Sequence, residues 1–158
     1  MKLLLTFALA LATTQASALS CIPPDPIRAF QVAFQSGDEY LILKGRFAFD
    51  ASGLPDAEVA GILVLPQPVP AEFVGFSLTL DGFTNDIAGP ITLMPTCIGA
   101  FCGGLQPGTD IIAFARRQGT GYVVEVDPCS GWLFTPDAVT EAVLSACIRG
   151  ESCVTGDF

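Results

Sequence analysis

The sequence predicts a single all-β domain with one C-terminal helix. Beyond its apolar start, the chain consists mostly of short runs of aromatic and branched residues that glycines and prolines separate, a pattern typical of strands and turns. Only one segment carries the end signals of a helix. About five or six strands with one packed helix indicate a barrel or a sandwich, and they fit a small Greek-key barrel of the OB type best.

The first 18 residues are typical of a cleavable secretory signal. An apolar run from Leu3 to Ala12 follows Lys2, and the small-residue tripeptide Ala16-Ser17-Ala18 comes soon after. Secretion would place the six cysteines where they oxidise to disulfides. We therefore expect a periplasmic or secreted protein.

The mature N-terminus has two candidate positions. Cleavage after Ala18 would leave residues 19–158 as one domain, whereas cleavage after Ser20 would make Cys21 the first residue. The stretch Ala18-Leu19-Ser20-Cys21 also resembles a lipobox, with Ala where Leu is strongly preferred. A lipoprotein is therefore the lesser alternative.

The charge of the chain limits its partners. Sixteen acidic residues stand against seven basic ones, for a net charge of −9. A surface of this sign repels phosphate backbones, so we expect no nucleic acid partner. Beyond the signal no apolar run approaches the roughly 20 residues that cross a bilayer, so we expect no transmembrane segment. The oligomeric state is left open.

The first half of the domain contains three predicted strands. The run from Glu39 to Asp50 is aromatic-rich, and Lys44-Gly45 suggests a bulge or sharp bend within it. Glu58 to Leu65 is a second apolar run. Phe73 to Leu80 alternates. One face of this third strand carries Val74, Phe76, Leu78 and Leu80.

The second half contains a short strand, a hairpin and the helix. Ile91 to Met94 is the short strand, and Asp110 to Arg116 and Gly121 to Val126 form the hairpin. Thr135 is the predicted helix N-cap, with Arg149-Gly150 at the end. The expected apolar face of this helix comprises Val139, Ala142, Val143, Ala146 and Cys147.

The sequence predicts a protein that is not an enzyme and that binds no cofactor or metal. It contains no histidine, which removes the Ser-His-Asp and Cys-His arrangements. Glu125 and Asp127 are a candidate carboxylate pair for a hydrolase, although solvated strand ends are the simpler interpretation. Asp81 to Asp86 offers oxygen ligands for calcium but lacks the EF-hand spacing, so a turn is favoured.

Several segments resemble a known family. They are the opening Cys21 to Phe30, a following strand that contains Lys44, the pair Cys102-Gly103, and Val126 to Trp132. In order and spacing these are similar to the tissue inhibitors of metalloproteinases. The resemblance implies the netrin-like OB-fold module that those inhibitors share with other secreted proteins.

The chain departs from that family at two cysteines. The inhibitors begin with a cysteine whose free amine and carbonyl clamp the protease zinc, and Leu19 stands at that position here. Gln31 replaces a third family cysteine. The resemblance with these departures implies three disulfides: Cys21 with Cys129, Cys97 with Cys102, and Cys147 with Cys153.

We therefore expect a non-enzymatic binding or inhibitor-like module that acts through loops, with another envelope or extracellular protein as partner. The candidate partner surface comprises Pro23, Pro24, Asp25, Phe101 and Trp132, which the resemblance brings to one edge of the barrel. Phe101, Trp132 and Phe134 could instead pack against the disulfides. The alternatives are a metalloprotease inhibitor, if Cys21 is the mature N-terminus, and a carboxylate-based hydrolase.

Overall fold

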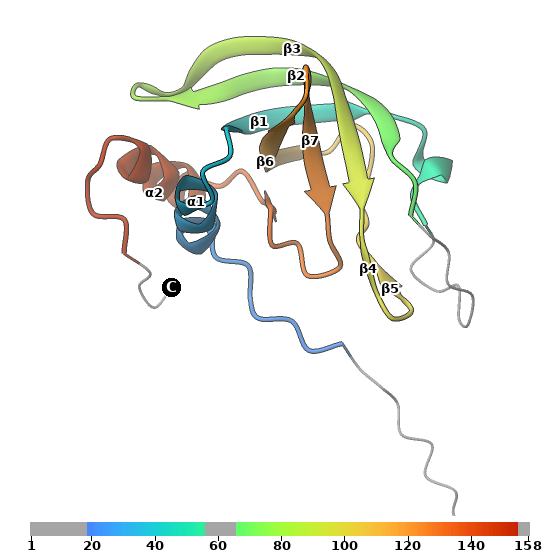
Figure 1. Cartoon of the computed structure of the whole chain (residues 1–158). Helices are drawn as coiled ribbons and strands as arrows, with labels where there is room; N and C mark the ends of the chain where they lie inside the picture. The colour runs from blue at the N-terminus through green and yellow to red at the C-terminus, as the bar shows by residue number, and fades with distance from the viewer. Residues whose placement is uncertain (1–18, 56–65, 155–158) are drawn as a thin grey trace, which may run out of the picture.

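The computed structural model describes residues 19–55 and 66–154 (Figure 1). The predicted signal and the predicted strand from Glu58 to Leu65 lie outside the described residues. Within the described part, no helix has the length and apolar character needed to span a membrane.

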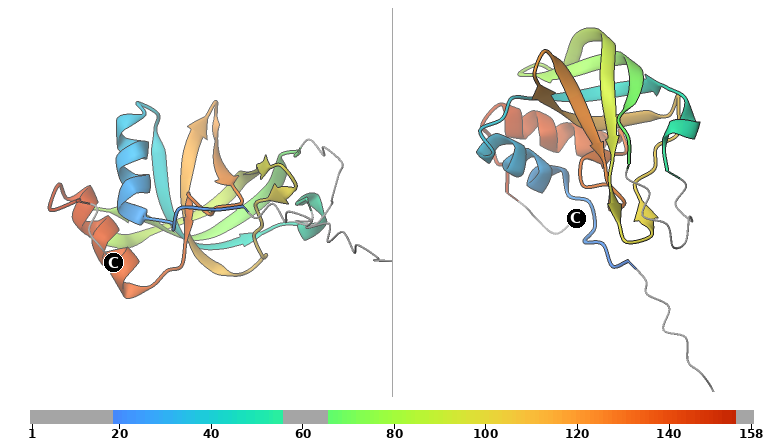
Figure 2. Two further views of the ribbon diagram at one scale, coloured as in Figure 1. Left: turned by 90° about the horizontal axis from the view of Figure 1, so that it is seen from below. Right: turned by 45° about the vertical axis from the view of Figure 1, so that its right-hand side comes forward.

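The centre of the structure is a sheet that closes on itself. Five strands form it: β1 Tyr40–Ala48, β2 Val69–Thr79, β3 Gly82–Pro95, β6 Asp110–Gln118 and β7 Gly121–Val126. β1 pairs antiparallel with β2 and β6, β2 with β3, and β6 with β7. A parallel pairing of β3 with β7 completes the ring. Figures 1 and 2 show the curved strands around a common interior.

Three short strands extend this sheet or stand beside it. β8 Leu133–Phe134 adds to the edge of β6. β4 Cys97–Ile98 and β5 Phe101–Cys102 form a separate small hairpin after β3. The predicted β6–β7 hairpin is confirmed, with Gly119 at positive φ in its turn.

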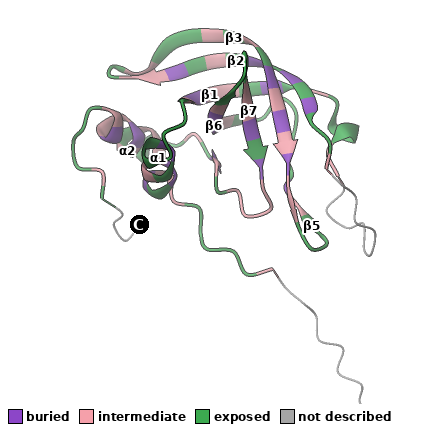
Figure 3. Cartoon of the chain, in the orientation of Figure 1, coloured by how far each residue is buried: buried purple, intermediate pink, exposed green. Residues whose placement is uncertain are grey.

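Two apolar cores lie on opposite sides of the sheet. One fills the barrel and includes Leu43, Phe47 and Phe73, and the other lies between the outside of the sheet and the helices. Neighbouring residues of a strand point to opposite faces, so Ile42 contacts the helices while Leu43 faces the interior. Figure 3 shows where buried residues lie along the strands and helices.

A helix that the sequence pattern did not predict precedes the barrel. α1 Pro26–Gln35 packs beside the C-terminal helix on the outside of the sheet (Figure 2). One carboxylate oxygen of Asp25 accepts from the backbone N–H groups of Ile27, at 2.9 Å, and of Arg28, at 3.2 Å. The prediction of a single helix was therefore wrong. The missed signal is an N-cap acid followed by proline at the first helical position.

The C-terminal helix is confirmed, but its start and its buried face differ from the prediction. α2 Ala138–Ile148 is capped by Asp137 and not by Thr135, and Gly150 at positive φ follows its end as expected. Leu144 and Cys147 are buried, whereas Val139 is 60% exposed. Of the predicted face, Cys147 is therefore buried and Val139 is not, and Leu144, which was not predicted, is buried with Cys147.

The predicted bulge at Lys44-Gly45 is absent. β1 runs against β2 and β6 in unbroken register through these residues, and the irregularity lies instead between Ser77 and Leu78 in the β2–β3 pairing. Gly45 pairs directly with Gly75 of β2. A side chain at Gly45 would meet the backbone of β2 and the ring of Phe73, so the glycine permits a close approach of the two strands.

The predicted face of β2 points outward. Val74 is 65% exposed and Phe76 is also exposed, while Val69, Ala71 and Phe73 are buried. The predicted short strand from Ile91 to Met94 is the last part of β3, which is much longer. This extra length pairs with β2.

The cap of α2 makes stability depend on pH. Asp137 accepts from the backbone N–H of Thr140 at 2.8 Å, and this bond holds the pKa of Asp137 below its ordinary value. Because the carboxyl is more acidic in the folded chain, its stabilising effect is present above the unfolded pKa and is lost as the pH falls through the folded one. We expect the Tm of Asp137→Asn to fall less than the Tm of the native chain when the pH is lowered from about 5 to about 2.

Thermal melts followed by circular dichroism measure this difference. Glu72→Gln is the matched control, because the Glu72 side chain has no hydrogen bond or ion pair to the described residues. Parallel Tm curves for Asp137→Asn and the native chain would contradict the expectation.

Candidate functional site

Three disulfides join all six cysteines. Cys21 is bonded to Cys129 with a Cα–Cα distance of 5.4 Å, and the other bridges are Cys97–Cys102 and Cys147–Cys153. These are the pairs that the resemblance implied. The first bridge fastens the segment before α1 to the loop after β7.

A groove of about 410 Å³ lies beside this first bridge. Its walls are the segment before α1, the first turns of α1 and the loop after β7. The lining residues are Ser20, Cys21, Ile22, Pro23, Pro24, Asp25, Arg28, Ala29, Val32, Cys129, Gly131 and Trp132. Four of the five residues of the predicted partner surface therefore share one groove.

Phe101, the fifth predicted residue, does not line the groove. It lies opposite Ile98 on the β4–β5 hairpin, which the Cys97–Cys102 bridge closes at its base. Phe101 is 39% exposed and Ile98 is 53% exposed. In Figures 1 and 2 the hairpin and the segment before α1 extend from the same end of the barrel.

Asp127 shapes the loop that forms one wall of the groove. Its two carboxylate oxygens accept from the backbone N–H groups of Cys129 and Gly131, each at 2.8 Å. Ser130 between them has a φ of 54°. Asp127 is thus engaged by backbone donors, whereas Glu125 is exposed on β7.

Trp132 belongs both to the groove and to the outer core. Its ring stacks on Tyr40 with centroids 5.7 Å apart and meets Phe114 at 5.9 Å. Burial raises the pKa of Tyr40 above its ordinary value. Phe134 is buried and meets Phe114 edge to face. Phe134 therefore packs within the outer core, while Trp132 also lines the groove.

The candidate calcium segment forms a turn and a strand. Leu80 and Asp81 make the turn between β2 and β3, and the residues from Gly82 onward pair with β2. Asn85 donates to the hydroxyl of Ser77 at 2.8 Å. Within residues 19–55 and 66–154, no three His, Cys, Asp or Glu side chains come together as metal ligands would.

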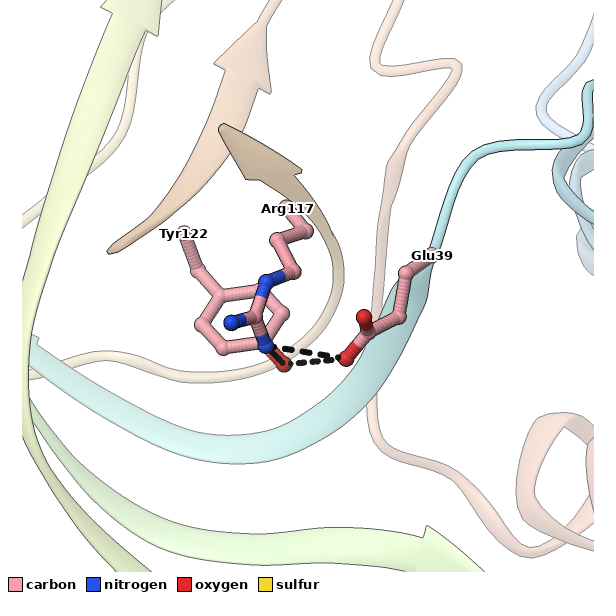
Figure 4. Close-up of polar contacts among 3 residues, drawn as sticks. All are labelled: Glu39, Arg117 and Tyr122. Carbon is pink, nitrogen blue, oxygen red and sulfur yellow. Dashed lines mark hydrogen bonds and ion pairs between the residues drawn. The ribbon is translucent and has the colours of Figure 1, made fainter. Parts of the chain in front are cut away.

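Five of the six basic side chains in the described part of the chain form ion pairs with carboxylates. The pairs are Lys44–Glu141, Arg46–Asp110, Arg116–Asp38, Arg117–Glu39 and Arg149–Glu151. Figure 4 shows one of them, in which Glu39 also accepts from the hydroxyl of Tyr122 at 2.8 Å. Arg28, in the groove, is the exception among the described residues.

Comparisons with protein families, with curated proteins and with solved structures find no match for this chain.

Proposed function

We propose that the protein is a periplasmic or secreted, non-enzymatic binding module that recognises another envelope or extracellular protein. Its contact surface comprises the groove beside Cys21–Cys129 and the β4–β5 hairpin. The observation that carries this proposal is that both surfaces expose apolar side chains on segments fastened by disulfides. A segment held in one conformation loses little entropy on binding, which favours recognition.

The barrel supports an OB-like Greek-key fold as the scaffold. A closed ring of five strands, with one parallel and four antiparallel pairings, is consistent with that fold. The bridge from Cys21 to Cys129 also agrees with the netrin-like resemblance. OB-like barrels commonly bind through the loops at their rim, so both candidate surfaces are suitably placed.

Capture from an envelope extract tests this proposal. The native chain and an Ile98→Ser, Phe101→Ser double variant are immobilised, and captured proteins are quantified by mass spectrometry. We expect one or more partners to fall about tenfold with the double variant, because apolar residues central to an interface supply much of the affinity. Val139→Ser is the matched control, since Val139 is exposed on α2 outside both surfaces. The proposal would be contradicted if all three proteins retained their partners equally, or if the native chain captured no protein.

Metalloprotease inhibition is the second candidate. Cys21 is exposed and its bridge to Cys129 holds it at the groove, so cleavage after Ser20 would present a fixed terminal amine there. A terminal amine is the group that the inhibitors direct at zinc. N-terminal sequencing of the mature protein tests this candidate, because a start at Leu19 removes this geometry.

A further inference from the structure

We infer that the groove binds an acidic side chain, Asp or Glu, of an extended segment of the partner protein, with Arg28 as the group that holds its carboxylate. This inference rests on the proposed function and specifies the chemistry of the partner. It starts from Arg28, the one basic residue of the described chain without a carboxylate partner.

No ion pair or side-chain hydrogen bond to the described residues accounts for Arg28 at its position. It is the third residue of α1, where the helix dipole disfavours a positive charge. Its backbone N–H is capped by Asp25, but its guanidinium makes no hydrogen bond to the described residues. A residue that opposes a local preference without a compensating contact is a candidate for a binding role.

Asp25, the acidic residue that lines the groove, forms no ion pair with Arg28. One oxygen of Asp25 accepts from two backbone N–H groups at the start of α1. Asp127, behind the opposite wall, uses both oxygens for the backbone of its own loop. One oxygen of Asp25 and both oxygens of Asp127 are thus engaged by backbone donors, and the guanidinium of Arg28 forms no ion pair with the described residues. A planar guanidinium matches a carboxylate through two parallel hydrogen bonds.

The rest of the groove suits apolar residues that flank an acid. Ile22 is 68% exposed and Val32 48% exposed, and Trp132 completes the lining with the two prolines. The volume of the groove, about 410 Å³, lies in the range of small-ligand sites. Because the protein carries a net charge of −9, long-range attraction does not draw an acidic segment in, and recognition depends on the short contact with Arg28.

Trp132 reports directly on this groove, since it is the only tryptophan of the chain. The probes are three mixtures of capped pentapeptides that lack Trp and Tyr. Their central residue is fixed as Asp, Asn or Lys, and the flanking positions are randomised among apolar residues. Each mixture is titrated against the full-length mature protein while the fluorescence of Trp132 is followed.

We expect the Asp mixture to bind about tenfold more tightly than the Asn mixture, and the Lys mixture to bind most weakly. Arg28→Gln should abolish the difference between Asp and Asn, and Arg28→Lys should restore part of it. Arg46→Gln is the matched control, because it removes the same charge outside the groove. It should leave the difference intact.

The possible failures are distinguishable. Equal binding of the Asp and Asn mixtures, or an unchanged preference in Arg28→Gln, would overturn the role of Arg28 and leave the proposed binding groove standing. Absence of any response from Trp132 to all three mixtures would overturn both.

Discussion

Replacing both Cys21 and Cys129 by serine is expected to lower the free energy of unfolding by about 4 to 5 kcal/mol, the largest effect of any disulfide removal in this chain. The bridge joins residues separated by 108 positions, so its loss frees the longest loop in the unfolded state. Natural domains are stable by only about 5 to 15 kcal/mol, so a substantial part of the total would be lost. Urea denaturation of the native chain and the double variant measures the difference.

Removal of the short Cys97–Cys102 bridge is the control for this prediction. Its cysteines are 5 positions apart, and the same relation between loop length and entropy gives about 2 kcal/mol. Equal losses for the two double variants would show that loop closure does not explain the stabilising effect. The long bridge should also be needed for peptide binding, because the segment before α1 would no longer be tied to the loop that carries Trp132.

The strands were predictable because a closed sheet leaves regular marks in the chain. Apolar runs end at glycines and prolines, and the β6–β7 hairpin followed from Gly119 and its neighbours. The cysteine pairs followed from the family resemblance, which supplies spatial proximity that spacing alone does not. The order of the strands in the ring depends on contacts between distant residues, so only its general type could be predicted.

Helix α1 was missed although its sequence carries both helical signals. Its polar residues Arg28, Gln31 and Gln35 recur at helical spacing, and the cap signal at Asp25 and Pro26 was present. The segment is only ten residues long and follows a proline-rich stretch, which favoured its interpretation as part of an extended opening. A short helix of this kind is stabilised mainly by packing on the barrel.

The inner face of β2 could not be predicted from alternation alone. A period of two separates two faces but does not say which is buried. Here Val74 and Phe76 lie outside because Phe73 occupies the interior, where it meets Phe47. The groove was only partly predictable for a similar reason, since Arg28 differs from the other basic residues by its missing partner, and partners appear only in three dimensions.

The second large effect is expected at Gly75 of β2, which pairs directly with Gly45 of β1. A Cβ on Gly75 would lie 2.7 Å from the Cα of Gly45 and 2.8 Å from the ring of Phe73, and closer still to the carbonyl oxygen of Lys44. Backbone atoms cannot move away as a flexible side chain can. We therefore expect Gly75→Ala to destabilise the protein by on the order of 3 kcal/mol, through overpacking and loss of strand pairing.

Gly104→Ala is the matched control for Gly75→Ala. Nothing lies within 4 Å of a Cβ built on Gly104, so this substitution should change stability by less than about 0.5 kcal/mol. Urea denaturation of both variants tests the expectation. Gly45→Ala should resemble Gly75→Ala, because a Cβ on Gly45 would meet the backbone of β2 and the same Phe73 ring. A loss at Gly75 no larger than at Gly104 would show that β1 and β2 can separate at this point without cost. That result would also show that the Phe73 ring does not need the space that the two glycines leave beside it.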